Sequence, residues 1–593
     1  MVTLQINNQS VTVPEGTSIL EAAKSIGVKI PTLCNFEKHE AKGACRVCLV
    51  DVEGARAPIA SCAMPVNAGM KVQTNTKSIR EARKFVLEML LSEHDGDCKV
   101  CDRNEDCELQ ALAFEMGIKT IRYEGEKTYK HIDDSTPALV RDSGKCIKCR
   151  RCVTACAEIQ GVGSLFPQGR GFQSIIGPAF GDDLNTVACV QCGQCGAICP
   201  VGAIVEKDHI QGVWAALDDN TKTVVVQTAP AVRAALGELF DYEPGTRVTG
   251  KMTSALRELG FNAVFDTNFT ADLTIIEEGM ELLSRLKNVL VDKKPAALPQ
   301  FTSCSPGWIN FVEFYYPQFI DNVSTCKSPQ QMFGALAKTY YAQKIGIKPE
   351  DMVVVSIMPC TAKKYEAQRP EMATNGIPDV DYVLTTRELG RMIKQAGIDF
   401  RNLPDGEMDA PMGIGSGAAD IFANSGGVME AAIRTVYEIV TGRELPMEQL
   451  HVEPLMGLKG LKKASLTITG TVPAWSFLEG VEVKVGVAHS LSNARLLMEA
   501  IKQGETFHFI EVMTCPGGCI SGGGQPRFTD DSVREKRIKA IYDEDEAKTL
   551  RKSHENPQIT EIYKEFLGEP LGKKSHHLLH THYHLKDDLK SDK

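Results

Sequence analysis

Several features of secreted, membrane and nucleic-acid-binding proteins are missing from this sequence. The first residues, MVTLQINNQSVTVPEGTS, contain no basic stretch followed by an apolar run, so they predict neither a signal peptide nor a twin-arginine leader. No apolar run approaches the roughly 20 residues that a membrane-spanning helix needs. The net charge of −10 argues against nucleic acid as the main partner. We therefore expect a cytoplasmic protein that binds no membrane and no nucleic acid.

Nucleotide-binding glycine motifs are also missing. The glycine-rich stretch GIGSGAADIFANSGG at 413–427 fits neither G-x-x-x-x-G-K-S/T nor G-x-G-x-x-G. No flavin or nicotinamide pattern is present elsewhere. If the chain exchanges electrons with such cofactors, a separate partner must hold them.

Cysteine, in contrast, is abundant, with 20 residues in a chain of 593. At roughly 150 residues per domain, this length suggests about four domains. In a reducing compartment, clustered cysteines usually bind metal and seldom form disulfides. The spacing of the cysteines is therefore the main guide to function.

A doubled four-cysteine motif is the strongest local signal. Each copy has the spacing C-x2-C-x2-C-x3-C, and proline follows the second copy, as in bacterial ferredoxins with two 4Fe–4S clusters. In that arrangement the fourth cysteine of each copy ligates the other cluster. The spacing predicts one cluster on Cys146, Cys149, Cys152 and Cys199, and another on Cys189, Cys192, Cys195 and Cys156. Paired zinc ribbons are the alternative, although they lack the third close cysteine.

Two further sets precede this motif. The first resembles the plant-type 2Fe–2S layout, with a longer first gap, and consists of Cys34, Cys45, Cys48 and Cys62. The second offers one imidazole and three thiolates for a 4Fe–4S cluster, and consists of His94, Cys98, Cys101 and Cys107. An imidazole removes one negative charge and should raise the cluster potential. A structural zinc ion is the alternative at both sites.

The secondary structure signals agree with this division. Alternating apolar residues around Asn7-Asn8 predict a β-hairpin over 1–13, and Ser18-x-x-Glu21 predicts a capped helix at about 18–26. Helical spacing predicts a helix over 79–92. Buried runs such as MVVVSIM predict strands of a parallel sheet in the C-terminal half.

We expect a multidomain protein of α+β and α/β class. The predicted parts are a β-grasp 2Fe–2S domain (1–78), a small 4Fe–4S domain with one histidine and three cysteine ligands (79–136), a bacterial-ferredoxin-like domain with two 4Fe–4S clusters (137–209), a large α/β domain (210–572) and a charged, His-rich peripheral tail (573–593). The tail histidines could bind a metal, but an exposed tail is the simpler prediction. They are His576, His577, His580, His582 and His584.

Three segments of the large domain carry a family resemblance. FTSCSPGW (301–308), MPCTAKKYE (358–366) and EVMTCPGGCISGGGQP (511–526) resemble the signature segments of iron-only (FeFe) hydrogenases. The resemblance implies reversible reduction of protons to dihydrogen. It also implies an H-cluster, which is a 4Fe–4S cube joined through a cysteine thiolate to a diiron unit with carbonyl, cyanide and dithiolate ligands.

The resemblance assigns roles to the remaining cysteines and their neighbours. It implies that Cys360, Cys515 and Cys519 bind the cube, with Cys519 as the bridging thiolate. It implies that Lys363 pairs with cyanide and that the rest of the diiron pocket is formed by Met358, Met513, Gln330 and Phe422. Without the cysteines, these residues would read as ordinary core packing. The glycines of 413–427 are expected to pack around the cluster.

The resemblance also implies a chain of proton-carrying groups. The matching residues are Cys304, Glu281, Ser324 and Glu278, with Arg285 at the surface end. Glu278 and Glu281 are three residues apart and can share one helix face. On its own, IIEEGMELLSRL would read as an amphipathic helix with solvated acids.

The sequence departs from the family at Ser305, where a second cysteine usually ligates the cube. A serine oxygen is a harder and less acidic ligand than a thiolate. Three interpretations remain open: Cys304 moves into the ligand role, Ser305 ligates as an alkoxide, or the substitution is engineered. Cys326 is left over, and we expect an unligated buried thiol there, with a redox role as the alternative.

Four accessory clusters imply electron exchange with an external carrier. Expected partners are ferredoxin, or subunits that bind flavin and NAD(P). A more specific form of this prediction is that the chain belongs to an electron-bifurcating complex. The substrates would be dihydrogen and protons. One alternative is a non-catalytic electron-relay or cluster-assembly protein, which Ser305 would favour. Another is a hydrogen-sensing protein, which loss of the relay thiol would favour.

Overall fold

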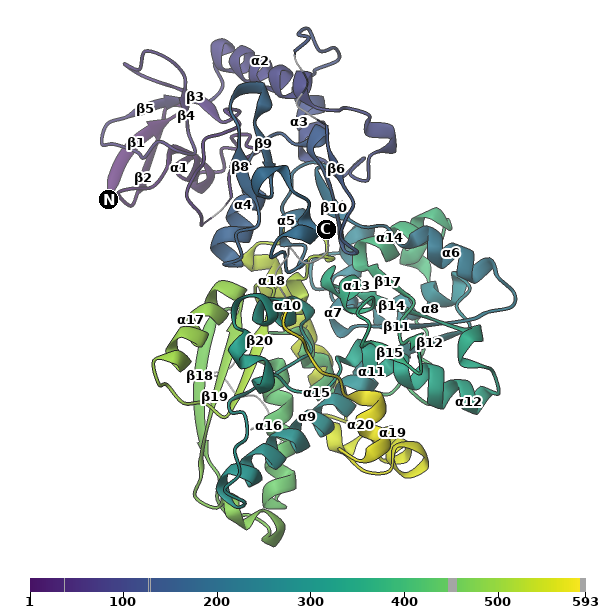
Figure 1. Ribbon diagram of the computed structural model, residues 1–593. Coiled ribbons are helices and arrows are strands. Elements are labelled where there is room, and N and C mark those ends of the chain that lie inside the picture. Colours follow the sequence, from purple (N-terminus) through teal and green to yellow (C-terminus); the bar gives the residue numbers. More distant parts are fainter. Residues whose placement is uncertain (37, 126, 128–129, 446–455, 587–593) are drawn as a thin grey trace.

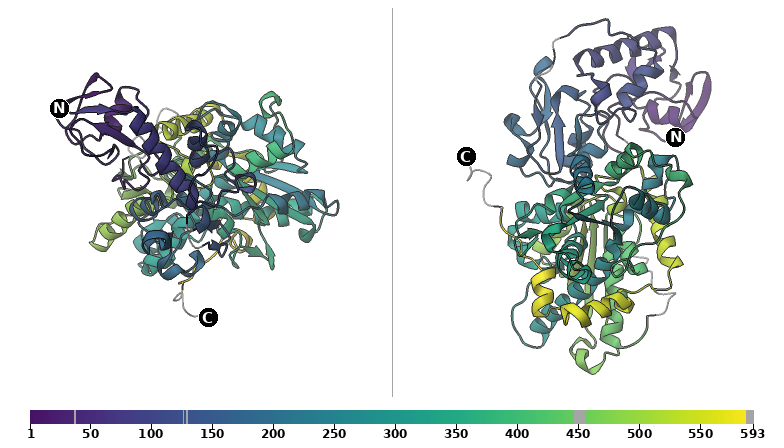
Figure 2. Two further views of the ribbon diagram at one scale, coloured as in Figure 1. Left: turned by 90° about the horizontal axis from the view of Figure 1, so that it is seen from above. Right: turned by 90° about the vertical axis from the view of Figure 1, so that its right-hand side faces the viewer.

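The computed structural model describes residues 1–36, 38–125, 127, 130–445 and 456–586 (Figure 1). Residues 1–209, here called the arm, form the upper part of the molecule, and the C-terminal part lies below it (Figures 1 and 2). None of the helices in these described ranges is long and apolar enough to cross a membrane.

The arm begins with a mixed sheet in the order β2-β1-β5-β3-β4. The predicted hairpin is present, because β1 (Val2–Ile6) and β2 (Gln9–Val13) pair antiparallel around Asn7 and Asn8, which both have positive φ. The predicted helix is α1 (Ile19–Ser25), and Ser18 and Glu21 form its capping box. The sheet is completed by β3 (Leu49–Val52), β4 (Ile59–Ala60) and β5 (Lys71–Gln73).

Helices connect this sheet to the doubled cysteine motif. The helix predicted over 79–92 is α2 (Lys77–Glu93), and α3 (Glu108–Glu115) follows the short helix η1 (Cys98–Val100). One apolar cluster joins Leu33, Leu87, Leu109 and Ile147, so all three segments of the arm share a core.

The doubled motif folds around two short helices that contact each other, α4 (Arg151–Thr154) and α5 (Gln194–Ala197). A sheet in the order β10-β7-β6 flanks them. The strands of this region are β6 (Ile132–Asp133), β7 (Leu139–Asp142), β8 (Phe166–Gln168), β9 (Ile175–Gly177) and β10 (Ile204–Glu206).

The described residues of the C-terminal part include two four-stranded sheets in two lobes (Figure 1). The first is fully parallel, as the buried runs predict, with the order β12 (Ala263–Asp266), β11 (Thr223–Thr228), β14 (Met352–Met358) and β17 (Tyr382–Thr385). In the second sheet only β18 is antiparallel to its neighbour, and the order is β13 (Gln300–Phe301), β20 (Phe509–Met513), β19 (Glu482–His489) and β18 (Leu461–Thr467).

Helix α9 (Thr267–Leu290) joins the two lobes. Phe269 and Leu273 belong to the core of the first lobe, whereas Ile275 and Leu282 belong to the core of the second. Helices α11 (Pro329–Leu336) and α16 (Gly427–Thr441) pack against α9. A long buried helix therefore fixes the relative position of the two sheets.

Further helices of the C-terminal part pack around the sheets and around one another. They are α6 (Ile210–Asp218), α7 (Pro230–Arg233), α8 (Thr249–Glu258), α10 (Pro306–Tyr315), α12 (Ala342–Ile345), α13 (Ala362–Glu366), α14 (Thr386–Gln395), α15 (Gly417–Asp420), α17 (Leu491–Lys502) and α18 (Asp531–Ala547). A small hairpin is formed by β15 (Ala373–Thr374) and β16 (Ile377–Pro378).

The prediction of a peripheral tail from 573 onward is wrong for the described part of that segment. After α19 (Pro557–Ile562), helix α20 (Lys573–Leu579) packs against α11 and buries Leu578 and Leu579. His580 is also buried, whereas His576 and His577 are exposed. The prediction failed because it relied on the many charged residues of this segment, whereas two leucines on one helix face determine how the helix packs. Residues 587–593 lie outside the described residues.

Candidate active site

A cavity lies where the parallel strands of both lobes end. Ala229 follows β11, Thr267 follows β12, and Met358 and Met513 are the last residues of β14 and β20. All four line the cavity, whose empty space, including the part open to solvent, is about 840 Å³. Ligands of open parallel sheets bind at this edge.

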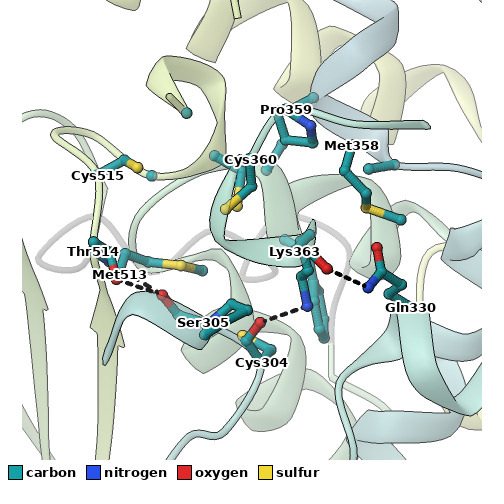
Figure 3. Close-up of a pocket in the computed structure, with 18 of the residues that line it drawn as sticks. Cys304, Ser305, Gln330, Met358, Pro359, Cys360, Lys363, Met513, Thr514 and Cys515 are labelled. Atoms are coloured by element: carbon teal, nitrogen blue, oxygen red, sulfur yellow. Dashed lines mark hydrogen bonds between the residues drawn. The ribbon is translucent and has the colours of Figure 1, made fainter. Parts of the chain in front are cut away.

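Four thiols of the C-terminal part, from three separate segments, line this cavity. They are Cys304, Cys360, Cys515 and Cys519, and all are free cysteines. Figure 3 labels the first three. Burial raises the pKa of Cys519 to about 12, and the nearby Cys360 thiol adds to the effect. A bound metal would replace the protons that burial holds on these thiols.

Ser305 lines the same cavity beside Cys304. It is the N-cap residue of α10, but its side chain makes no capping hydrogen bond. Its Oγ instead lies 2.8 Å from Thr514 Oγ1. The Thr514 amide also donates to Ser305 Oγ at 3.3 Å. Figure 3 shows the Ser305 hydroxyl pointing toward Thr514, the residue before Cys515.

The predicted cation is Lys363, at the start of α13. Its Nζ donates to the Cys304 carbonyl at 3.1 Å and lies 2.9 Å from the Glu366 carboxylate. Gln330 Nε2 donates to Glu366 at 3.1 Å and to the Lys363 carbonyl at 3.3 Å. Met358, Met513 and Phe422 line the cavity with them. The predicted pocket residues therefore face one space.

The four predicted relay residues behind Cys304 also come together. Arg285 Nη2 lies 2.7 Å from one oxygen of Glu281, and Ser324 Oγ donates to the other at 2.8 Å. Ser324 also contacts Glu278. Burial raises the pKa of Glu278 to about 8, and the Glu281 charge adds to this rise. Burial and then the Glu278 charge raise the pKa of Cys304 well above its usual value, which places Glu278 on the Cys304 side of the chain.

In the arm, two crevices each collect four cysteines in the predicted crossed sets. One is lined by Cys146, Cys149, Cys152 and Cys199, and the other by Cys156, Cys189, Cys192 and Cys195. Each motif copy has two residues with positive φ at the same positions, Lys148 and Arg150 in one and Gln191 and Gly193 in the other. Alternating backbone of this kind turns successive N–H groups toward a bound anionic group.

Of the other two sets, the first is gathered by contacts between its thiols. The Cys34 thiol contacts those of Cys45 and Cys62, and the Cys48 thiol also contacts Cys62. His94 is half-buried at the end of α2, and its Nδ1 has no hydrogen-bond partner among the described residues. Burial lowers the pKa of His94. A neutral imidazole with a free ring nitrogen suits a metal ligand.

The arm and the cavity meet at Cys192, which lines both the second crevice and the cavity. A Cβ added to Gly523 would lie 2.2 Å from the Cys192 carbonyl oxygen, and one added to Gly193 would lie 2.4 Å from Thr361 Oγ1. Only glycine allows the two backbones to approach this closely. The contact places a cysteine of the arm at the edge of the cavity.

The C-terminal part of the chain matches two known protein families. Residues 222–523 match the family described as iron only hydrogenase large subunit, C-terminal domain, and 531–586 match the iron hydrogenase small subunit family. The chain is 51% identical to NADP-reducing hydrogenase subunit HndD of Solidesulfovibrio fructosivorans, over 99% of this chain and 100% of that protein. The chain belongs to the iron-only hydrogenase family.

Other relatives agree with this assignment. Iron hydrogenase 1 of Clostridium pasteurianum is 38% identical over 98% of this chain and its own full length. A solved structure of a FeFe-hydrogenase HydA1 variant from Chlamydomonas reinhardtii is 46% identical, with a TM-score of 0.57, and covers 64% of this chain and 99% of that one. Three families of iron–sulfur domains match the arm: the 2Fe-2S iron-sulfur cluster binding domain (1–77), the NADH-ubiquinone oxidoreductase-G iron-sulfur binding region (83–122) and the 4Fe-4S dicluster domain (145–203).

This hydrogenase is therefore an oxidoreductase that oxidises dihydrogen and reduces protons, with electrons relayed through iron–sulfur domains. The family resemblance inferred from the three signature segments is confirmed. So is the multidomain fold class with 2Fe–2S and 4Fe–4S domains ahead of a catalytic domain.

Some residues of this hydrogenase site were not singled out from the sequence. Glu366 joins Lys363 to Gln330, and Ser328 Oγ donates to the same carboxylate at 2.9 Å. Thr514 holds the Ser305 hydroxyl. Glu366 and Thr514 both lie inside signature segments, so their positions in the sequence could have identified them as site residues. Ser328 carries no such signal.

Proposed function

We propose that the chain is the catalytic subunit of a multi-cluster hydrogenase with one 2Fe–2S cluster, three accessory 4Fe–4S clusters and an H-cluster. The observation that carries this proposal is the convergence of four thiols and Lys363 on one cavity that adjoins an arm cysteine. The proposed accessory ligands are the four sets named above, and the crossed crevices support two of them.

The residues around the cavity fit an H-cluster. Cys360, Cys515 and Cys519 would hold the cube, and Lys363 offers a cation to an anionic ligand. Gly518 has φ near 103°, and a Cβ there would lie 2.6 Å from the Ser425 amide nitrogen, so the loop that carries Cys519 packs directly on backbone. When bound, the group supplies the iron centre at which dihydrogen is split and formed.

We favour Ser305 at the fourth ligand position of the cube, with Cys304 as the proton carrier. The Ser305 hydroxyl lies beside Thr514 and therefore on the side of Cys515. Among charged groups, in contrast, Glu278 has the largest effect on the pKa of the Cys304 thiol. If Cys304 ligated the cube, Glu278 would have no thiol to exchange protons with.

The proton path runs through side chains of this chain alone. Glu278, whose pKa is raised to about 8, holds a proton at neutral pH inside the protein and can pass it to Cys304. Ser324 lies between the two carboxyl groups and can donate to one while it accepts from the other. Arg285 keeps Glu281 oriented at the outer end, where both side chains are still slightly exposed.

We further propose that the arm passes electrons between the cavity and an external carrier, either ferredoxin or a subunit that binds flavin and NAD(P), in an electron-bifurcating complex. The printed name of the Solidesulfovibrio relative, a subunit of an NADP-reducing hydrogenase, supports this proposal. The N-terminal sheet projects from one side of the molecule, where a carrier can approach it (Figure 2).

Infrared spectroscopy of the anaerobically matured protein tests the proposal. We expect carbonyl and cyanide stretching bands that shift under dihydrogen. The Cys519→Ala variant, which lacks the bridging thiolate, should retain the accessory clusters and lose these bands. Intact accessory clusters without such bands in the wild-type protein would contradict the proposal and leave an electron-relay protein.

A further inference from the structure

A second set of metal-ligating side chains lies on the outer side of the relay, away from the cavity. Glu281, Cys326 and His580 are all buried, and one ligand atom from each lies within 4.8 Å of the others. The set combines a carboxylate, a thiol and an imidazole, which are the ligand types of zinc sites. Nothing in the proposed hydrogen chemistry uses Cys326 or His580.

The backbone holds Cys326 and His580 opposite each other in an isolated antiparallel bridge. The Lys327 amide donates to the Leu579 carbonyl and the Thr581 amide donates to the Thr325 carbonyl, both at 2.7 Å. These bonds flank the pair, so Cys326 and His580 form a non-hydrogen-bonded pair, in which side chains approach most closely. The bridge thus holds the thiol and the imidazole side by side without a metal.

The imidazole is oriented by a carboxylate behind it. His580 Nε2 lies 3.1 Å from Glu277, which also accepts hydrogen bonds from Tyr563, Ser575 and the Leu571 amide. Because the Glu277 carboxylate accepts all of these bonds, it also serves as the acceptor for an Nε2 proton of His580. The Nδ1 lone pair is then left for the other side, where it now lies 2.8 Å from the Thr325 hydroxyl. Metal-binding histidines are commonly oriented in this way.

We propose that Glu281, Cys326 and His580 form a binding site for a zinc ion, with water as the fourth ligand. Tetrahedral zinc places its ligand atoms about 3.5 Å apart, so the three side chains need to close by roughly 1 Å. Binding transfers the thiol proton of Cys326 to solvent and forms a zinc–thiolate bond. The ring of His576, which is exposed, stacks on His580 with centroids 4.6 Å apart, so the site lies one ring below the surface.

The consequence for the enzyme rests on the proposed proton path. Zinc on Glu281 would occupy the carboxylate that accepts the Ser324 hydrogen bond and pairs with Arg285. Proton transfer between the surface and Glu278 would stop at that point. Zinc would therefore inhibit hydrogen turnover without touching the cavity, whose lining includes none of the three ligands.

The test compares the cluster-loaded wild-type chain with Cys326→Ala and Cys326→Ser. We expect micromolar zinc sulfate to inhibit hydrogen evolution by the wild-type enzyme and a chelator to restore it. Both Cys326 variants should keep their activity without zinc and need at least about tenfold more zinc for half inhibition. His577→Ala is the matched control, because His577 is an exposed histidine of the same helix, and this variant should remain as sensitive as the wild type.

Zinc K-edge X-ray absorption gives a readout that does not depend on activity. We expect one sulfur and several nitrogen or oxygen ligands at the wild-type site, loss of the sulfur in Cys326→Ala, and unchanged iron content in both. Equal zinc inhibition of wild type and Cys326→Ala, or a zinc spectrum without sulfur, would overturn the proposal. A chain that binds zinc through sulfur but never evolves hydrogen would refute the proposed function and leave the zinc site standing.

Discussion

Replacing Glu278 with glutamine isolates the carboxyl group on which the proton path depends. The pKa of Glu278 rises from 4.5 to about 8 because the group is buried and lies beside Glu281. At about 1.4 kcal/mol per pH unit, this rise corresponds to roughly 5 kcal/mol of preference for the protonated form. The unfolded chain releases the same proton near pH 4.5. Glu278 therefore makes the folded state progressively less stable as the pH rises from 4.5 to about 8, and no further above that.

The assay follows the carboxyl C=O infrared band over a pH series. In the wild-type protein we expect a band that disappears as the pH rises through about 8, and Glu278→Gln should lack it. Hydrogen evolution by Glu278→Gln should fall by at least about 100-fold, the usual loss for a missing proton-transfer group, while the carbonyl and cyanide bands remain. Glu277→Gln is the matched control for the band, because Glu277 is buried on the same helix with a lowered pKa.

Two results would refute this reasoning. One is a Glu278→Gln enzyme that keeps more than about a tenth of the wild-type rate. The other is a carboxyl band that titrates near pH 4.5, the ordinary value, which would mean that water or a charged partner solvates Glu278.

Three further predictions concern the electron path and the cluster ligands. Gly523→Ala should slow carrier-linked turnover at least about tenfold and leave dihydrogen–deuterium exchange unchanged, because its Cβ would displace Cys192 by roughly 1 Å; an equal loss in both assays would place the damage in the cavity. Cys304→Ala should abolish turnover but keep the paramagnetic signal of the cube, and loss of that signal would make Cys304 a ligand in place of Ser305. His94→Cys should lower the potential of its cluster in a redox titration followed by electron paramagnetic resonance, since a thiolate adds negative charge; an unchanged potential would exclude His94 as a ligand.

The sequence was most informative where ligands are close in the chain. The crossed cysteine sets followed from the spacing around Cys146 and Cys189, because a short loop can place only certain thiols around one cluster. The helices at 18–26 and 79–92 followed from local capping and periodicity. These features depend on few residues and little on the rest of the fold.

Features built from distant segments could not be predicted from local pattern. Glu281 and Ser324 meet because α9 lies against the segment that leads into α11, and only the family resemblance suggested this pair. The pairing of Cys326 with His580 had no signal at all, since it depends on where the last helix docks. The prediction of a peripheral tail failed at 573–586 because it was based on composition. Histidines and lysines outnumber the two leucines that decide the packing there.

The close contact of Gly193 and Gly523 with the opposite part of the molecule bears on how such enzymes should be compared. Neither glycine binds metal or moves a proton, yet each occupies a point where a single methyl group would push the arm away from the cavity. Two homologues could share every ligand and every relay residue and still differ widely in how fast electrons arrive. A comparison of ligands and relay residues alone would treat them as equivalent. A substitution at either glycine, however, would leave the catalytic site intact and slow electron transfer to it.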